Sequence, residues 1–324
     1  MPVAPSQEEV LSYFDTLSNW GRWGDDDTLG TLNLITDAKR RQAASLVHEG
    51  VSISCSRLIP WGGPQLAGGN PVIDMAQSGE RYALGDNPED PAMPGVEPLQ
   101  WAGERLSFAF HGSIFTHIDG LAHVFFDGKM YNGRSAGLVK ASEGALEQTS
   151  EVMRDGIMTR GVLLDVARAL GQDPLPMAPG VYPEDLEAAE AAQGVRVEEG
   201  DVVLLRTGYG AQHEAAILAR QEPPHEHSGY HAATLPWLHE RGAAVIGSDV
   251  TTDTRYLDPN YKRTRMPVHQ IALVAMGLRL IDNAHLERLA VACEERGRWE
   301  FCFTLNPLRF ERGTGSPANP IATF

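Results

Sequence analysis

The sequence predicts a single α/β domain spanning residues 1–324. Apolar runs of strand length alternate with segments of helical periodicity along the chain, which is typical of mixed α/β folds rather than of segregated halves. No internal repeat or low-complexity block divides the chain. The composition, 42% hydrophobic and 22% charged, is ordinary for a globular protein with a sizeable core.

The N-terminal part, about residues 1–50, is expected to form a helical extension. Ser6 followed by Glu9 matches a capping box that opens a short helix. A second helix is expected over 36–50, with Thr36 as its N-cap and Gly50 as its terminator. An alternating strand then follows at 51–59.

The stretch from about residue 60 to 104 is rich in glycine, proline and polar residues. It is too long for an ordinary connection between two elements. We therefore expect a long loop that serves as a lid, an oligomer arm or a pocket wall.

The remaining chain alternates regularly between the two kinds of element. Pro183 suits the first turn of one helix and Gly194 its end. Strands are expected at 106–110, 161–166, 202–207, 243–249, 278–282 and 299–305, and helices at 183–193, 235–241, 268–276 and 286–295.

Charge and composition exclude several classes of partner. A net charge of -16 leaves no basic stripe for nucleic acid. No segment approaches the roughly 18 apolar residues of a membrane span, and the N-terminus has no signal-peptide pattern, so a cytoplasmic location is expected. Cys55, Cys293 and Cys302 lack CxxC spacing and are expected to be reduced, small buried residues.

The most informative segment is 110–133, which brings together three histidines and an aspartate: His111, His117, Asp119 and His123. On a strand, His117 and Asp119 would share a face, and Gly120 would allow the bend that lets both reach one ion. Imidazole and carboxylate are donors that zinc and manganese accept. The alternative is that this pair only caps a turn.

Four neighbours of that pair are further candidates. His111 would lie about 20 Å from His117 on an extended strand, so it would be a pocket group unless the chain folds back. Ser113 and Phe115, on the same strand face, are candidate substrate contacts. His123 suits a general acid/base, although it could instead be a ligand or a core histidine.

Further candidates lie downstream. His269 opens an apolar helix and Asp282 ends the next strand, and such ends are where sites collect in open α/β folds. Of the four histidines in 225–239, His231 is the candidate pocket group because it approaches a helix, whereas His225, His227 and His239 are expected to be solvated.

Tryptophans in glycine-rich loops are candidate pocket walls for a planar substrate. Trp20 and Trp23 stand in one such loop, and Trp61 in another. The competing interpretation, that they pack their loops on to the core, is equally well supported by the sequence.

The run Thr116-His117-Ile118-Asp119 followed by His123 resembles the hallmark HxGTHxDxxxH of the cyclase family, which includes bacterial kynurenine formamidase, isatin hydrolase and trans-dienelactone hydrolase. Weaker similarities to the family's longer branch cover most of the chain. They are found at 20–24, 31–33, 269–270, 282–283 and 315–321.

The resemblance implies a swivelling α/β/α domain, a homo-oligomer such as a dimer or tetramer, and a divalent metal, zinc or manganese. It implies that His117, Asp119, His269 and Asp282 bind metal and that His123 is the acid/base. Two departures bear on the number of ions. Ser113 stands where the formamidases have their first ligand histidine, with His111 two residues earlier, and the spacing from His269 to Asp282 is one residue longer. One ion with fewer protein ligands is therefore as plausible as two, and His111 stays a candidate ligand.

The expected function is hydrolysis of an amide or lactone bond in a small cyclic or aromatic substrate, by a metal-activated water with His123 as acid/base. There is no GxSxG elbow and no phosphate-binding loop in a strand-to-helix setting. Two alternatives remain: a metal-dependent cyclase or lyase without net hydrolysis, and a metal-dependent small-molecule binding protein without turnover.

Overall fold

A mixed sheet forms the centre of the molecule in the computed structural model, which describes residues 3–61, 72–255, 259 and 261–324. Among these residues, nine strands pair in the order β1 (Ser52–Ser54), β13 (Ile321–Thr323), β11 (Glu300–Leu305), β7 (Ile157–Asp165), β8 (Val202–Arg206), β9 (Val245–Ser248), β10 (Arg279–Asp282), β4 (His117–Asp119) and β12 (Gly315–Pro317). Strands β7 to β10 run parallel, and the flanking pairs are antiparallel.

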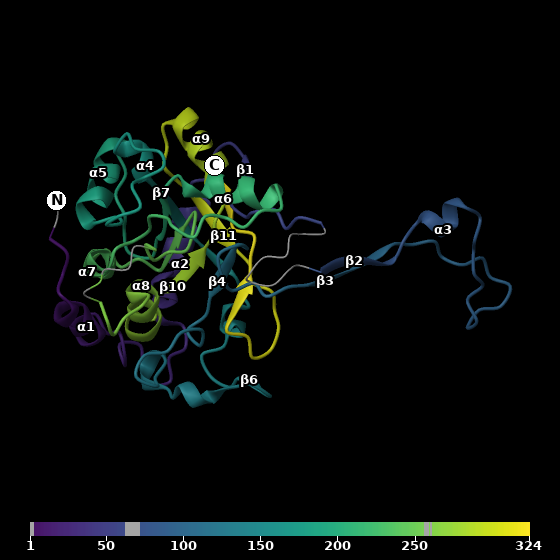
Figure 1. The fold of residues 1–324 in the computed structure, drawn as a ribbon, viewed down its shortest axis with the longest axis horizontal. Helices are drawn as coiled ribbons and strands as arrows, with labels where there is room; N and C mark the ends of the chain where they lie inside the picture. The colour runs from purple at the N-terminus through teal and green to yellow at the C-terminus, as the bar shows by residue number, and fades with distance from the viewer. Residues whose placement is uncertain (1–2, 62–71, 256–258, 260) are drawn as a thin grey trace.

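Helices pack on both faces of this sheet (Figure 1). The helices are α1 (Gln7–Thr16), α2 (Asp37–Ala44), α4 (Val166–Ala169), α5 (Pro183–Gln193), α6 (Tyr209–Leu218), α7 (Leu235–Glu240), α8 (Pro267–Gln270), the π-helix η6 (Ile271–Met276) and α9 (Glu287–Arg296). Short 3₁₀ turns lie at Gly30–Leu34, Tyr131–Gly133, Ala136–Leu138, Ser150–Met153 and Ala232–Thr234, and a small ladder joins β5 (Val139–Lys140) to β6 (Gly144–Ala145).

Alternation along the central strands divides the apolar side chains between two cores. Val162 and Leu164 of β7 pack into one core with α1, α5 and α7, whereas Leu163 packs into the other with α9. This is the period of two that a strand imposes. The predicted α/β/α arrangement with a mixed sheet is confirmed.

Local capping explains which predicted helix ends are right. The Ser6 hydroxyl accepts from Glu9 N at 3.1 Å at the start of α1, and Gly194 ends α5 with φ 63°. The predicted end of α2 at Gly50 is wrong, because the helix stops at Ala44. The backbone N–H of Gly50 instead donates to Phe324 O at 2.8 Å, so contact with the C-terminus overrides helix extension.

Two predicted strands are also wrong in extent. The strand expected over 51–59 is continuous only over Ser52–Ser54, with an isolated bridge from Ser56 to Ala284, and Arg57 N then donates to the Thr116 hydroxyl at 2.9 Å. The strand expected over 106–110 is instead β3 (Gly103–Ser107), and residues 108–116 form bends rather than an extended run into β4.

A two-stranded arm projects from the body of the molecule (Figure 1). Its stalk is β2 (Val72–Gln77) paired with β3, and α3 (Glu80–Ala83) lies near its tip. The predicted loop over 60–104 therefore contains a ladder, while its portion at 62–71 lies outside the described residues. Large apolar side chains of the arm are exposed, among them Leu84 at 86% and Leu99 at 80%.

None of the helices described here combines the length and apolar character needed to cross a bilayer. Cys55, Cys293 and Cys302 are buried free thiols, as predicted.

Candidate metal centre

Strand β4 carries the centre of the site. It lies between β10 and β12, with His117 paired to Asp282 on one side and Asp119 paired to Gly315 on the other. Ile118 points into the core beneath the sheet. His117 and Asp119 therefore share the opposite face, as predicted, and the register brings Asp282 beside them.

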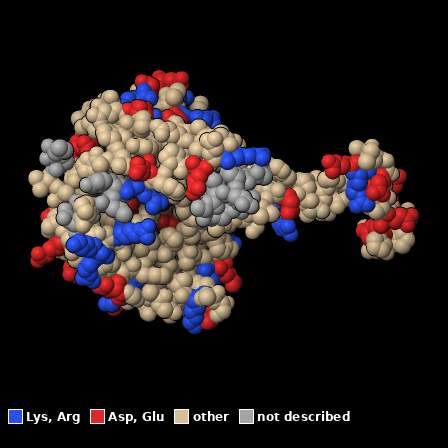
Figure 2. All heavy atoms as spheres, viewed as in Figure 1, with Lys and Arg blue, Asp and Glu red and all other residues tan. Residues whose placement is uncertain are grey.

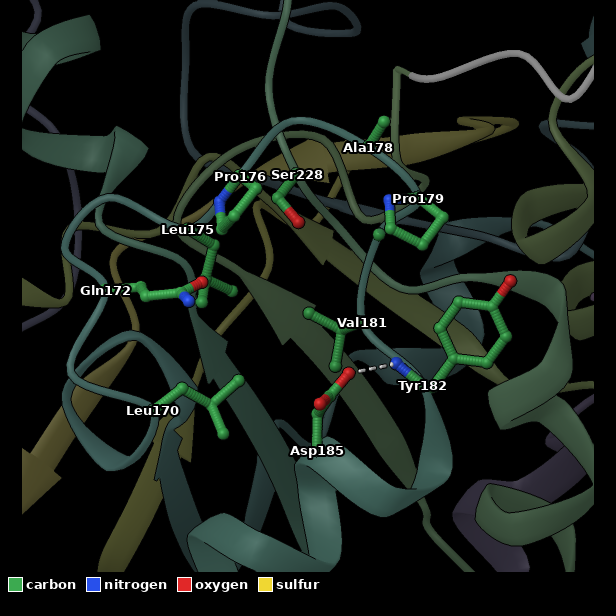
Figure 3. A pocket seen from close by; sticks show the side chains of 11 residues that line it. Leu170, Gln172, Leu175, Pro176, Ala178, Pro179, Val181, Tyr182, Asp185 and Ser228 are labelled. Atoms are coloured by element: carbon green, nitrogen blue, oxygen red, sulfur yellow. Dashed lines mark hydrogen bonds between the residues drawn. The ribbon is translucent and has the colours of Figure 1, made fainter. Parts of the chain in front are cut away.

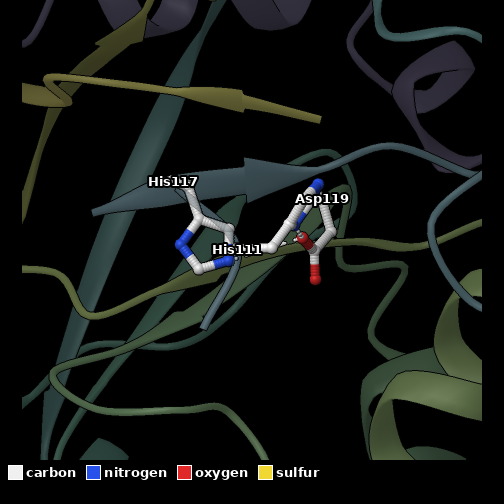
Figure 4. A group of neighbouring side chains, drawn as sticks. All are labelled: His111, His117 and Asp119. Carbon is white, nitrogen blue, oxygen red and sulfur yellow. Dashed lines mark ion pairs between the residues drawn. The ribbon is translucent and has the colours of Figure 1, made fainter. Parts of the chain in front are cut away.

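Nitrogen atoms of four histidines surround the carboxylate of Asp119. Its Oδ1 lies 2.9 Å from His111 Nδ1, 3.5 Å from His117 Nε2 and 3.8 Å from His123 Nε2, and its Oδ2 lies 3.5 Å from His269 Nε2. Figure 4 shows the first part of this group, with His111 and His117 directed toward Asp119. Asp119 is only 1% exposed.

His111 reaches the cluster because the chain folds back on itself before β4. Gly112 adopts φ +130°, which side chains rarely allow, and the Asn283 amide donates to Gly112 O at 2.7 Å and to Phe115 O at 3.2 Å. The extended geometry expected for His111, about 20 Å from His117, is therefore wrong: the two rings are 5.2 Å apart.

His269 and Asp282 form a second group that also includes Asp119. His269 Nε2 lies 3.3 Å from Asp282 Oδ2 as well as near Asp119 Oδ2. His269 Nδ1 lies 2.6 Å from Asp253 Oδ2, so this ring presents Nε2 to the cluster. The Thr252 hydroxyl donates to Asp282 Oδ1 at 2.7 Å and fixes that carboxylate.

The residues present fit a divalent cation. Both oxygens of Asp119 and His111 Nδ1 are buried, and despite the 2.9 Å contact between Asp119 Oδ1 and His111 Nδ1 none of these atoms forms a hydrogen bond of regular geometry with a described residue. Leaving such atoms unsatisfied is costly unless something else contacts them. Zinc bonds of about 2.0–2.2 Å set tetrahedral ligands roughly 3.3–3.6 Å apart, close to the separations across this cluster. Two triads can each hold an ion, His111–His117–Asp119 and Asp119–His269–Asp282.

The electrostatics of the cluster keep Asp119 charged and His123 neutral. Burial opposes the charge on Asp119, yet the surrounding histidines, His123 first among them, hold the pKa of this carboxyl below its usual range. Burial lowers the pKa of His123 to about 4, outweighing the attraction of Asp119. His123 is therefore a neutral imidazole at pH 7, and its ring stacks on His111 with centroids 3.7 Å apart.

Ser113 and Phe115, the predicted substrate contacts on the 111–116 turn, have different surroundings. The Ser113 hydroxyl accepts from Arg255 at 3.0 Å, and its carbonyl accepts from Arg57 at 3.3 Å. Phe115 is buried against Phe108 with ring centroids 4.9 Å apart, and its carbonyl accepts from His117 Nδ1. Its backbone orients His117, whereas its ring packs in a small core.

The other predicted pocket residues lie away from the cluster. Trp20 donates from Nε1 to Val274 O at 2.6 Å, which packs its loop on to η6, and Trp23 lies beneath the Arg22 guanidinium at 4.7 Å. His231 caps the 3₁₀ turn Ala232–Thr234 and stacks on Tyr182. No contact described for these three side chains reaches Asp119.

Sequence reasoning missed several buried polar residues around the site. They are Arg57, His213, Asp253 and Asn283, the half-buried Arg255, and His227, which was expected to be solvated but is only 1% exposed. Asp253 had a readable signal, because it closely follows the parallel strand β9 and ligand sites gather at such ends. The others are brought in by tertiary contacts that no sequence spacing encodes.

A separate hollow of about 160 Å³ lies beside the start of α5 (Figure 3). It is lined mainly by apolar side chains such as Leu170, Leu175 and Val181. None of the residues predicted for the site lines it.

A match to a family model identifies the class of protein. The Cyclase family model matches residues 42–253. The chain belongs to the cyclase family.

Solved structures show the same fold. A protein described as a novel cyclase has 28% identity and a TM-score of 0.82, with 96% of this chain and 99% of that chain covered. Isatin hydrolase A from Ralstonia solanacearum has 19% identity and a TM-score of 0.53, covering 84% and 91%. A predicted metal-dependent hydrolase from Bacillus stearothermophilus has 11% identity and a TM-score of 0.50, covering 85% and 98%. No curated protein matches the sequence.

Gly315 tests how His111 is positioned. A Cβ at this residue would lie 2.7 Å from His111 Cε1 and 2.6 Å from Ile118 O, so Gly315→Ala must displace the ring or the strand. We expect Gly315→Ala to bind manganese about tenfold or more weakly, measured by calorimetry. Gly79→Ala is the matched control, since its added Cβ meets nothing within 4 Å. Equal affinities for the two variants would contradict a role for His111 in the centre.

Proposed function

We propose that this protein is a divalent-metal-dependent hydrolase that opens an amide or lactone bond in a small cyclic or aromatic substrate. One observation carries the proposal: the buried carboxylate of Asp119 forms no hydrogen bond of regular geometry with the described residues and belongs to two triads of metal-ligand side chains, beside a neutral histidine. The isatin hydrolase among the similar structures acts on a cyclic amide, which supports this choice of bond.

The donor set favours zinc or manganese. His111, His117 and His269 supply imidazole nitrogen, and Asp119 and Asp282 supply carboxylate oxygen, a mixture that borderline divalent ions accept. A bound ion would polarise the substrate carbonyl and acidify a water. The hydrogen bonds of His117 and His269 to Phe115 O and Asp253 fix which ring nitrogen each presents.

His123 is placed to move the proton. Its Nε2 faces Asp119 at 3.8 Å, its side chain is 28% exposed, and its neutral ring can accept a proton from the attacking water. The same nitrogen then returns that proton to the leaving nitrogen or oxygen. Asp119 favours the imidazolium formed in between, because opposite charges attract strongly in a buried site.

Removing the base gives the first test. In His123→Gln, the kcat for hydrolysis of isatin or of a cyclic amide and lactone panel should fall about 10²- to 10⁴-fold, because no group remains to accept the water proton. Metal content should be unchanged, and His48→Gln, which alters an exposed histidine whose ring contacts Ser45 O, is the control. Equal rates for His123→Gln and wild type would remove His123 from the chemistry.

The same assay separates the alternatives. Oxygen from labelled water should appear in the product of a hydrolase, whereas a lyase or cyclase would leave the product unlabelled. A filled metal site with no turnover across the panel would favour a binding protein.

Metal stoichiometry tests the shared role of Asp119. We expect Asp119→Asn to lose all bound metal on dialysis, since the carboxylate belongs to both triads, whereas Asp282→Asn should lose only the ion on its own side. Elemental analysis of both purified variants measures this. Full retention of metal by Asp119→Asn would contradict the assignment.

We also propose that the arm binds a second copy of this chain. An isolated two-stranded ladder is marginally stable in water, yet β2 and β3 are largely exposed, and Leu84, Leu99 and Trp101 present apolar surface. The tip shows acidic side chains in Figure 2, whereas the stalk is mostly uncharged. A partner surface would bury the stalk.

Light scattering at micromolar concentration tests the arm. Wild type should have the mass of a dimer or tetramer, and the double variant Leu99→Ser/Trp101→Ser should shift toward monomer because its apolar contact area is reduced. Leu308→Ser, an exposed leucine on the body, is the control at 60% exposure. A wild-type protein that is monomeric would contradict the proposal.

A further inference from the structure

A second group of polar side chains lies beside the 111–116 turn, which carries His111. Arg57, His213 and His227 are 4%, 1% and 1% exposed, and Arg255 is half-buried. The rings of His213 and His227 are 5.7 Å apart. Both arginines converge on Ser113, one on its carbonyl and one on its hydroxyl.

Neither arginine has a carboxylate partner among the described residues. Arg57 donates to neutral oxygens only, at the carbonyls of Ser113, Ile114 and Asp249 and at the Asn283 amide oxygen. The Nε atoms of Arg57 and Arg255 are buried and, within the described chain, have no hydrogen-bond partner. Buried positive charge without a counter-charge is costly.

The nearby carboxylates are held elsewhere. Asp249, Glu214 and Asp282 act on Arg57 from a distance. Asp249 accepts from backbone N–H groups at the start of α6, Glu214 lies 2.7 Å from a histidine nitrogen, and Asp282 belongs to the candidate metal centre. None of them forms a direct ion pair with either guanidinium.

The two histidines add polar atoms but no charge. Burial, and then the charge of Arg57, lowers the pKa of His213 to about 3, and burial lowers that of His227 to about 4. His227 Nδ1 contacts Ser228 O at 3.0 Å, whereas its Nε2 and both ring nitrogens of His213 are buried without a described partner. The charge of the group therefore comes from the arginines.

A hollow of about 320 Å³ opens on to Arg255. It is lined by the cations Arg255 and Arg265 with His225, and by the acids Glu226 and Asp253. Asp253, which orients His269 from the Nδ1 side of that ring, also lines this hollow.

We propose that Arg255, with the charge of Arg57 behind it, binds a carboxylate of the substrate, so that the enzyme acts on acidic substrates. The planar guanidinium suits a carboxylate, and the ligand would supply a counter-charge that none of the described residues supplies by a direct ion pair. This inference rests on the proposed hydrolase function. It adds the class of substrate: a small ring that carries an acid group besides the bond to be cleaved.

Calorimetric binding of benzoate and benzamide to the purified protein tests the site. Benzoate should bind about tenfold or more weakly to Arg255→Gln than to wild type, and Arg255→Lys should recover part of the loss because the charge remains. Benzamide should not distinguish the three. Arg263→Gln is the control, since that side chain is exposed and pairs with Asp127.

Benzoate affinity unaffected by Arg255→Gln in a protein that melts like wild type would overturn the inference, since the anion would then bind elsewhere. The outcome is independent of turnover. Arg255-dependent binding without hydrolysis of any panel substrate would leave the anion site standing and remove the proposed function, whereas His123-dependent hydrolysis with Arg255-independent binding would do the reverse.

Discussion

The carboxylate of Asp119 is the constraint on which the site depends. It is buried, accepts no hydrogen bond of regular geometry from the part of the chain that the structure describes, and lies within 4 Å of nitrogens from four histidines. A buried charge of this kind is tolerated only where opposite charge compensates it. The neighbouring imidazoles do so in part, and a divalent cation would do so fully. Asp119 thus links the two triads electrostatically as well as geometrically.

The fold supplies the precision that this arrangement needs. Strand β4 is short, but pairing on both sides fixes its register, so that His117 lies opposite Asp282 and Asp119 opposite Gly315. Asp253 accepts from the backbone N–H groups of Val268 and His269 where α8 begins, and from the His269 ring. One carboxylate therefore positions both a helix and its ligand histidine, which is how supporting residues orient metal ligands.

Sequence periodicity predicted the central strands and most helices, because β7, β8 and α5 follow simple local rules. It failed where tertiary contacts decide. Helix α6 went unpredicted, since its start depends on Asp249 accepting the backbone N–H groups of Gly208 and Gly210. His111 was misplaced for a similar reason: the fold-back at 111–116 is held by Asn283, which is remote in sequence.

The residues of the candidate site also differ in how far the sequence predicts their positions. His117, Asp119 and His123 are close in sequence, so their spacing alone predicted that they lie together. Trp20 was chosen because it stands in a glycine-rich loop and His231 because it approaches a helix; in the structure Trp20 packs its loop on to η6 and His231 caps a 3₁₀ turn. Arg57 and Arg255 had no local signal, because both contact Ser113, which is remote from them in sequence.

Anomalous X-ray scattering from a crystal grown with manganese tests the central claim most directly. The account predicts anomalous density within bonding distance of Asp119, between its carboxylate and His117 or His269. Density located only elsewhere, with Asp119 binding nothing in a fully loaded crystal, would contradict it.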